Sequence, residues 1–395
     1  MSRWQELEHE YIMNTVKRVP RTLVRGEGVW VWDEDGRKYL DFVGGWAVNS
    51  LGHCHPVVTK AITEQANILI QTSNQFYTVP QVRLAELLIQ NSCLDKVFFC
   101  NSGTEANEGA VKLARRYGRQ YLDGAYEVIT TTGSFHGRTL AMVAATGQSK
   151  FQQPYVPLPA GFINVEYNNV EAIKNATTSQ TCAVLLEPLQ GEGGVNLPDD
   201  DYLSAVRTWC EEKGILLILD EIQTGIGRTG TLFAYEQYGI EPDIMTLAKG
   251  LANGIPIGAI LAKESVSVFT PGEHGSTFGG NPLSCAVGYA TVKFIIDNDI
   301  AGNAKRVGKY LTTGLESLRR KFQFITDVRG CGLLIALEFG SDIAESVLMA
   351  CLDKGLLVNK LKPNTVRFMP SLIVNNKEVD EALGILDGVL SSIVG

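Results

Sequence analysis

Two charged residues follow apolar runs in the middle of the chain and could do chemistry together. Asp220 ends the run that starts at Leu216, and Lys249 follows the run that starts at Ile244. A lysine amine that is withdrawn from water has a lowered pKa, and the free amine can form a Schiff base with an aldehyde. A buried carboxylate can keep a pyridine nitrogen protonated, which makes pyridoxal phosphate an electron sink. The pair indicates a site for this cofactor, although a lysine taken alone is most often simply solvated.

A third segment combines a small-residue turn with the start of a helix. Residues 101–108 follow another apolar run, and Ser102 and Glu105 have the spacing of a capping box. The Gly103-Thr104 turn offers backbone N–H groups and a hydroxyl to a phosphate. An ordinary capped helix is the competing interpretation, and the segment alone does not exclude it.

A fourth segment, residues 133–139, contains an aromatic ring, an imidazole and a guanidinium. The flat ring of Phe135 can stack on a heteroaromatic cofactor, and Arg138 can bind a carboxylate with two hydrogen bonds. His136 could pack, act as a general base or bind a metal. No second histidine or cysteine at ligand spacing accompanies it, so packing is the preferred interpretation and no metal site is expected.

Two nucleotide-binding motifs have partial matches in this region. Residues 216–221 resemble the magnesium-binding strand of P-loop nucleotide hydrolases, but the chain has no Gly-x-x-x-x-Gly-Lys-[Ser/Thr] loop. Residues 225–230 satisfy Gly-x-Gly-x-x-Gly, yet the acid near the expected distance, Asp243, begins the next strand instead of ending it. We therefore interpret residues 225–230 as a glycine-rich loop that lets the backbone pass close to the site.

The elements that must position these residues alternate along the chain. Six apolar runs lack a polar alternation, as strands buried on both faces do: 97–100, 127–131, 183–186, 215–219, 244–247 and 259–261. Helical patterns lie between several of them, for example at 105–116 and 202–213. This order predicts an α/β fold with a mostly parallel sheet covered by helices. All four segments then fall at carboxyl ends of strands, where open parallel sheets bind ligands.

The two ends of the chain have a different pattern. A hairpin is expected at 29–42, and helices at 282–297 and 303–320 precede strand-like pieces near 333–338 and 366–369. We expect a small α+β domain built from both termini, because a chain of this length suits two unequal domains. The predicted division is 1–50 for the N-terminal part of the small domain, 51–281 for the large domain and 282–395 for the C-terminal part.

Composition narrows the classes of partner and compartment. The 395-residue chain is 45% hydrophobic and 20% charged, which is typical of globular proteins. A net charge of -8 without any basic cluster interleaved with aromatics disfavours nucleic acid as a partner. The eight cysteines form no Cys-x-x-Cys pair and indicate a reducing compartment. The sequence has no apolar signal core or membrane span, so we expect a cytoplasmic protein with no membrane partner.

Eight segments resemble the class III, or ω-amino, branch of the pyridoxal-phosphate aminotransferases. They are residues 52–56, 102–108, 135–139, 187–194, 220–225, 249–250, 275–282 and 328–332. They occur in the order of that family and cover nearly the whole chain. The resemblance implies a fold-type I homodimer that carries pyridoxal 5'-phosphate.

The resemblance also implies a role for each matching residue. The cofactor contacts fall on Ser102, Gly103, Thr104, Phe135, Asp220, Gln223, Lys249 and Thr277. Gly103 and Thr104 then bind the phosphate, and Phe135 stacks on the ring. Asp220 pairs with the ring nitrogen and Gln223 contacts the phenolic oxygen. Lys249, the second catalytic residue with Asp220, attaches the cofactor and shuttles a proton at the substrate carbon.

In such dimers a residue pair reaches the neighbouring subunit's site. The resemblance assigns Thr277 to the neighbour's phosphate and Ser276 to the neighbour's substrate. A monomer would therefore lack part of each site.

The same resemblance implies how the substrates are held. Arg138 binds the carboxylate far from the reacting amine, and Arg367 is a second carboxylate partner that Glu192 neutralises until glutamate arrives. A movable Glu192-Arg367 pair lets one pocket accept both substrates, because an unpaired buried guanidinium would be costly.

The implied reaction moves the terminal amino group of N2-acetylornithine to 2-oxoglutarate. The products are N-acetylglutamate 5-semialdehyde and glutamate, in arginine biosynthesis. Ornithine, succinylornithine or another ω-amine as donor, and a catalytically silent cofactor-binding module, are the alternatives. Val16 and Trp46 depart from the pattern of enzymes that act on acetylornithine, and they bear on the acetyl group if they line the outer pocket.

Overall fold

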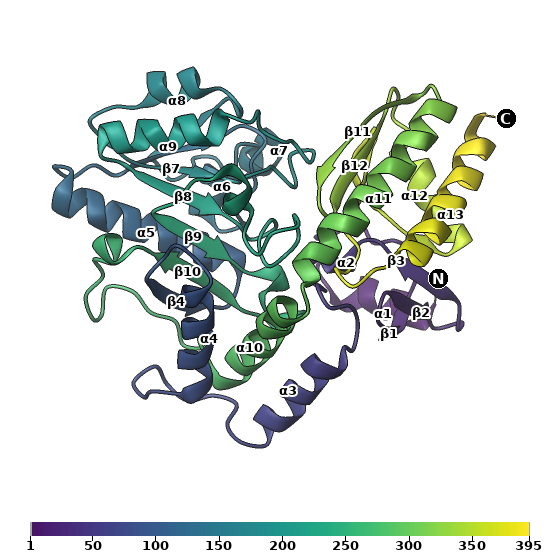
Figure 1. Ribbon diagram of the computed structural model, residues 1–395, viewed down its shortest axis with the longest axis horizontal. Helices are drawn as coiled ribbons and strands as arrows, with labels where there is room; N and C mark the ends of the chain where they lie inside the picture. Colours follow the sequence, from purple (N-terminus) through teal and green to yellow (C-terminus); the bar gives the residue numbers. More distant parts are fainter. Residues whose placement is uncertain (1, 395) are drawn as a thin grey trace.

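The chain forms two units that lie side by side in the computed structural model, which describes residues 2–394 (Figure 1). The larger unit contains a seven-stranded sheet in the order β4-β10-β9-β8-β7-β5-β6. Its strands are β4 (Lys96–Cys100), β5 (Glu127–Thr131), β6 (Phe162–Val165), β7 (Thr181–Leu186), β8 (Leu216–Asp220), β9 (Ile244–Leu247) and β10 (Gly258–Ala262). β10 is antiparallel to both neighbours, and the other pairs are parallel. The predicted α/β class with a mostly parallel sheet is confirmed.

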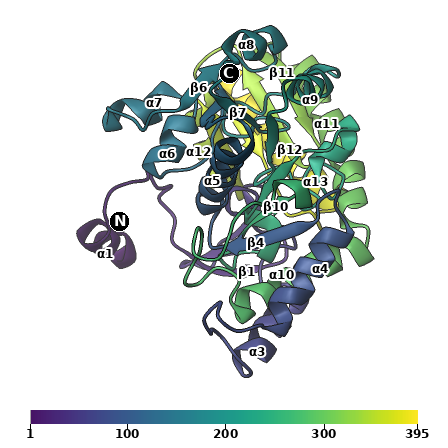
Figure 2. The same ribbon diagram turned by 90° about the vertical axis from the view of Figure 1, so that its left-hand side faces the viewer.

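Both faces of this sheet are buried, which explains the absence of polar alternation in its strands. In β7, Val184 and Leu186 belong to one core, whereas Cys182 and Leu185 belong to the other. The first core is shared with α3 (Pro56–Ala66), α4 (Val79–Gln90), α8 (Val170–Ala176), α9 (Tyr202–Lys213) and α10 (Pro282–Asp297), and the second with α5 (Gly103–Tyr121) and α6 (Leu140–Ala145). The short α7 (Ser149–Gln152) follows α6 and lies beside it (Figure 2). Among residues 2–394, no helix has the length and apolar character that crossing a bilayer requires.

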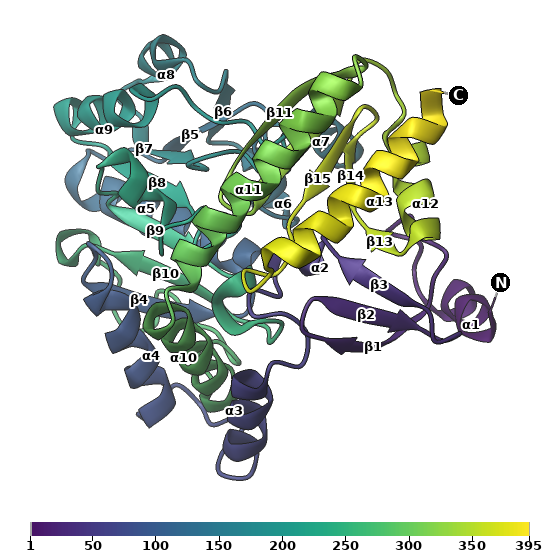
Figure 3. The same ribbon diagram turned by 45° about the vertical axis from the view of Figure 1, so that its right-hand side comes forward.

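The smaller unit is built from both ends of the chain and has two four-stranded sheets. One sheet combines β1 (Leu23–Glu27), β2 (Trp30–Asp33) and β3 (Lys38–Asp41) with β13 (Leu356–Leu357), which runs parallel to β3. The other contains β11 (Ile325–Cys331), β12 (Leu334–Phe339), β14 (Asn359–Lys362) and β15 (Thr365–Phe368). Figure 3 shows α11 (Ile300–Lys321) and α13 (Asn376–Val394) lying across this second sheet, with α12 (Ala344–Lys354) beside α13. The remaining helices of the N-terminal part are α1 (Arg3–Tyr11) and α2 (Gly44–Ala47).

The sequence predicted most elements, including the edge strand β4, but missed the edge strands β1 and β6. The bounds of β5, β9, α9 and α10 agree with the predicted runs. β6 was not predicted, because it lies at the sheet edge with half-buried side chains and contains the polar Asn164. β1 was missed for a similar reason, since four of its five residues are exposed.

The division into domains stays a prediction, but the packing of α10 bears on the second boundary. Val287, Val292 and Ile295 of this helix lie in the core of the larger unit, and α10 packs against α3 and α4. We propose to place the boundary after Asp297 instead of before Pro282.

The glycine-rich loop at residues 225–230 lies against the smaller unit. The Arg228 carbonyl accepts the Leu333 N–H at 3.0 Å, and Arg228 Nη1 donates to the Leu333 carbonyl at 3.0 Å. None of its residues lines the cavity of the candidate site, but Ile226 lies next to the segment that carries Lys249, since a Cβ at Gly250 would be 3.6 Å from Ile226 Cβ. The loop attaches the smaller unit to the segment that follows Asp220.

Candidate active site

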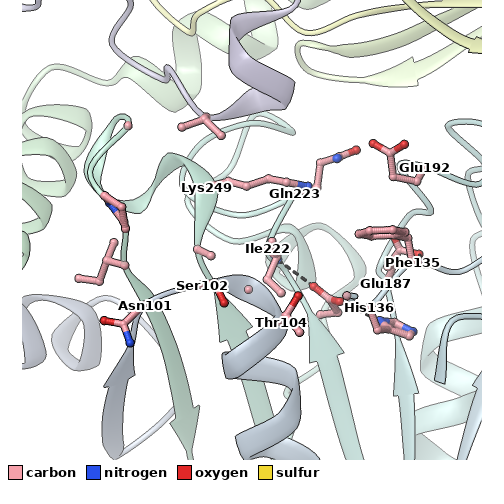
Figure 4. A pocket seen from close by; sticks show the side chains of 18 of the residues that line it. Asn101, Ser102, Thr104, Phe135, His136, Glu187, Glu192, Ile222, Gln223 and Lys249 are labelled. Atoms are coloured by element: carbon pink, nitrogen blue, oxygen red, sulfur yellow. Dashed lines mark hydrogen bonds and ion pairs between the residues drawn. The ribbon is translucent and has the colours of Figure 1, made fainter. Parts of the chain in front are cut away.

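Segments that follow five parallel strands surround a cavity of about 290 Å³ (Figure 4). They follow β4, β5, β7, β8 and β9, and their lining residues include Ser102, Gly103, Thr104, Phe135, Glu192, Asp220, Gln223 and Lys249. In Figure 4, Ser102 and Thr104 come from the start of the helix below the cavity, and Phe135, His136 and Glu187 lie to its right. The segments singled out in the sequence therefore meet at the carboxyl ends of these strands.

Lys249 lies two residues after the end of β9 and begins a short 3-10 helix, η3 (Lys249–Ala252). Its φ of +41° is uncommon for a residue with a side chain and costs conformational energy. Burial lowers the pKa of Lys249; the Glu192 carboxylate opposes this effect, and the Arg367 guanidinium adds to it. The site thus holds an amine of reduced proton affinity, as Schiff-base chemistry requires.

Asp220 ends β8 and is almost completely buried. Its Oδ2 accepts a hydrogen bond from Asn107 Nδ2 at 2.7 Å and one from His136 Nδ1 at 2.8 Å, and its Oδ1 accepts the Ile222 N–H at 3.1 Å. Asn107 is fixed in turn, because its Oδ1 accepts the Thr246 hydroxyl at 2.8 Å. These three donors occupy three of the about four acceptor positions of a carboxylate. Capacity remains for a cationic N–H in the cavity.

The amino terminus of α5 lies at the cavity and has the free N–H groups that can bind an anion. Ser102 Oγ accepts the Glu105 N–H at 3.2 Å, as predicted for a capping pair. Glu105 does not return a bond to Ser102; its carboxylate accepts the Asn101 N–H at 2.7 Å instead. The first-turn N–H groups of a helix have no acceptor within the helix, and the dipole of a long helix adds positive potential there. Gly103 and Thr104 carry these groups at the cavity.

The segment that carries Phe135 is held by a buried acid. Glu187 Oε2 accepts the Phe135 N–H at 3.1 Å, and Glu187 Oε1 accepts the Gly191 N–H at 3.1 Å. Burial raises the pKa of Glu187 to about 7, and the nearby His136 acts in the opposite direction. One carboxyl group therefore fixes both the aromatic segment and the loop that leads to Glu192.

Arg367 in β15 is completely buried and connects the smaller unit to the cavity. Its nitrogens donate to Asn359 Oδ1 at 3.0 Å, Gln223 Oε1 at 3.2 Å and Glu192 Oε1 at 2.7 Å. Burial acts to raise the pKa of Glu192, but the charges of Arg367 and Lys249 and the hydrogen bonds from Arg367 and Gln223 together lower it. Gly191 lies beside this group, and a Cβ there would be 1.8 Å from Gln223 Oε1, so any larger residue would displace the Gln223 side chain.

Arg138, Ser276 and Thr277 do not line the cavity of this single chain. Arg138 is exposed, and its backbone N–H donates to Thr104 Oγ1 at 3.3 Å. Ser276 Oγ accepts from Asn101 Nδ2 at 3.0 Å, and Thr277 is exposed. The assignment of the last two residues to a neighbouring subunit stays a prediction.

Comparison with known proteins identifies the family. The model of the aminotransferase class-III family matches residues 11–390. The chain belongs to this family. It is 51% identical to the acetylornithine aminotransferase of Caldanaerobacter subterraneus subsp. tengcongensis over 98% of both chains.

Two solved structures of class-III relatives have the same fold. An ornithine aminotransferase from Toxoplasma gondii, with partial occupancy of pyridoxal phosphate at its active site, has a TM-score of 0.95 and 33% identity, and the match covers 99% of this chain and 94% of that one. The acetylornithine aminotransferase of Elizabethkingia anophelis has a TM-score of 0.88 and 34% identity over 98% of both chains.

Membership of the class-III aminotransferases makes pyridoxal 5'-phosphate the cofactor, and the residues present fit it. When bound, this group withdraws electrons from the carbon that loses a proton. The helix start at Gly103 and Thr104 suits its phosphate, Asp220 has acceptor capacity for its ring nitrogen, and Lys249 offers an amine of lowered pKa.

Sequence reasoning missed how three residues hold the site together, since it assigned His136 to packing and gave Asn107 and Glu187 no role. Asn107 and His136 fix Asp220, and Glu187 fixes the Phe135 segment. All three lie in segments that carry the family resemblance, but their partners are distant along the chain. A sequence pattern shows neighbours on one element and does not reveal such contacts.

Proposed function

We propose that this chain transfers the terminal amino group of N2-acetylornithine to 2-oxoglutarate, with Lys249 and Asp220 as catalytic residues. The observation that carries the proposal is the ionic pair between the buried Arg367 and the half-buried Glu192, 2.7 Å apart beside the cavity. Glutamate has a carboxylate beside its reacting amine, whereas the acylated donor has none at that position. The enzyme therefore needs a cationic side chain that binds this carboxylate and that another residue neutralises when the donor is bound. The Caldanaerobacter relative, named for acetylornithine, supports this donor.

The proposed roles follow from where each group lies. We assign the proton transfer at the substrate carbon to Lys249, because burial lowers its pKa and so favours the free amine that can accept a proton. Asp220, held by Asn107 and His136, keeps the ring nitrogen protonated. Gln223 lines the cavity and accepts a hydrogen bond from Arg367, which supports its proposed contact with the phenolic oxygen.

The two departures from the acetylornithine pattern do not line this cavity. Val16 is 44% exposed and Trp46 is 51% exposed, and neither belongs to the lining. They therefore give no reason, within one chain, to reject the acetyl group.

The donor is tested by comparing four amines with 2-oxoglutarate as acceptor. We expect kcat/KM to be highest for acetylornithine, and lower for succinylornithine, ornithine and 4-aminobutyrate. Free ornithine is the rival donor, since a solved relative is an ornithine aminotransferase. A higher kcat/KM for ornithine than for acetylornithine would contradict the proposal.

The ionic pair gives a second prediction. Glu192→Ala leaves Arg367 available at all times, so glutamate binding should strengthen relative to acetylornithine by roughly 1–3 kcal/mol, the range of a charge-assisted hydrogen bond. Arg367→Ala should impair the glutamate half-reaction more than the acetylornithine half-reaction. Single-turnover measurement of each half-reaction in both variants checks this.

A matched control is available in the smaller unit. Glu338 pairs with Arg329 at 2.7 Å, away from the cavity lining. Glu338→Ala should change both half-reactions equally or leave them unchanged. If Glu192→Ala behaves in the same way, the pair at Arg367 is structural and takes no part in substrate choice.

The functional unit that we propose is a homodimer in which Ser276 and Thr277 complete the neighbour's site. Asn74 Nδ2 donates to the Ser276 carbonyl at 3.0 Å, and large apolar side chains near it are exposed, including Ile68, Phe76 and Tyr77. Such an exposed group is typical of an interface. Sedimentation analysis tests this state, and an active monomer would contradict it.

We propose the cytoplasm as compartment. All eight cysteines are free, and five of them are buried: Cys100, Cys182, Cys210, Cys285 and Cys351. Burial raises the pKa of each of these thiols to about 12, so they act as packing groups. Free thiols are typical of a reducing compartment.

A further inference from the structure

The side chain of Arg138 rests on an aromatic ring that sequence analysis did not single out. Its guanidinium carbon lies 4.0 Å from the ring centroid of Phe151 and 5.3 Å from that of Phe135. We propose that Phe151 positions Arg138 for the far carboxylate of the substrate, which makes it a specificity-determining residue. This inference rests on the proposed function, because it takes Arg138 as the carboxylate partner.

No carboxylate in residues 2–394 lies within ion-pair distance of Arg138. A ring face attracts a guanidinium through its quadrupole and leaves the N–H edges free. A carboxylate in the same place would occupy those edges and compete with the substrate. Phe151 can therefore hold Arg138 in one position without blocking the bidentate contact that an incoming carboxylate needs.

The ring itself is firmly placed. Phe151 lies in α7, and the neighbouring Gln152 donates through Nε2 to the Ala144 carbonyl at 3.3 Å, the Thr146 carbonyl at 2.9 Å and Asn164 Oδ1 at 3.0 Å. These bonds attach α7 to the end of α6 and to β6. Half-burial limits the freedom of the Phe151 side chain further.

Phe151 also contacts the ring proposed to stack on the cofactor. The centroids of Phe135 and Phe151 are 5.7 Å apart, and their planes meet at 76° in an edge-to-face arrangement. The two rings and Arg138 thus form one packed group, with Phe135 facing the cavity. Phe151 thus links Arg138, the proposed partner of the substrate carboxylate, to Phe135, the ring proposed to stack on the cofactor.

The test compares two donors that differ only in the carboxylate. Acetylornithine has it, and N-acetyl-1,4-diaminobutane is the same amine without it. Phe151→Leu keeps apolar volume but removes the ring face. We expect it to weaken acetylornithine binding about fivefold in single-turnover reactions, the size of one cation–π contact, and to leave the maximal rate nearly unchanged. The donor without a carboxylate should lose less than about twofold. The dissociation constant of glutarate, a dicarboxylate that does not react, should rise by a similar factor to that of acetylornithine.

Two further variants separate positioning from folding. Phe151→Tyr retains the ring face and should restore binding to near the wild-type value. Lys150→Gln removes the neighbouring cation, whose Nζ lies 4.7 Å from the same ring, and should have little effect. Equal losses for both donors in Phe151→Leu would overturn the inference, because they would show a general packing defect. Failure of the wild-type protein to use acetylornithine would instead count against the proposed function.

Discussion

Lys249→Ala is expected to lower turnover by at least about four orders of magnitude, because one substitution removes both the covalent attachment and the proton-transfer group. The cofactor should remain bound non-covalently, since the helix start at Gly103, the Phe135 ring and Asp220 belong to other segments. Borohydride treatment followed by mass spectrometry should find the cofactor attached to the wild-type chain and not to the variant.

Lys263 provides the matched control for this substitution. It follows β10, which runs antiparallel to β9, and so lies where the parallel strands begin, on the side of the sheet away from the cavity. There its Nζ is 3.7 Å from Asp243 Oδ1. Lys263→Ala should retain near wild-type turnover. Transamination by Lys249→Ala at a rate close to that of the wild type would refute the assignment of Lys249.

The placement of the main site segments could be predicted because it follows from topology. The runs that end at Cys100, Thr131, Asp220 and Leu247 lack polar alternation, which is typical of strands in a parallel sheet covered by helices. Parallel strands bring their carboxyl ends to one edge, and that rule alone places the helix start, the ring, the acid and the amine together.

The contacts between distant side chains could not be predicted in this way. Nothing in the spacing of Asn107, His136 and Asp220 indicates that one carboxylate oxygen accepts bonds from the other two. Phe151 was missed for a different reason, since an aromatic residue in a four-residue helix has no periodicity to mark it. These partners depend on how loops fold back over the sheet edge.

The role of Arg367 stands between these cases. The family resemblance implied that Arg367 pairs with Glu192, and in the structure the two side chains are 2.7 Å apart. The third contact, to Asn359 on the neighbouring strand β14, was not visible in the sequence. It satisfies the remaining guanidinium edge and explains how an arginine can be completely buried there.

Asp220→Asn is expected to slow removal of the substrate proton by about three orders of magnitude, because a neutral amide cannot keep the ring nitrogen cationic. The hydrogen-bond pattern adds a second effect. Both oxygens of Asp220 accept N–H groups, so either orientation of an amide turns its NH2 toward another donor. Such a buried mismatch costs about 1–3 kcal/mol of stability. The variant should therefore fold with a lower unfolding midpoint and react far more slowly.

Asp243→Asn separates the two effects, because Asp243 is also buried on this sheet but lies at the amino end of β9. Its carboxylate accepts hydrogen bonds from Arg207 at 2.7 Å and from the Leu217 N–H at 2.8 Å. This control should lose a comparable amount of stability and keep the rate of proton removal. Measuring the deuterium isotope effect at the reacting carbon together with thermal unfolding distinguishes the variants. An unchanged rate and isotope effect in Asp220→Asn would show that the carboxylate acts only as a buried structural acceptor, and its pairing with the ring nitrogen would have to be abandoned.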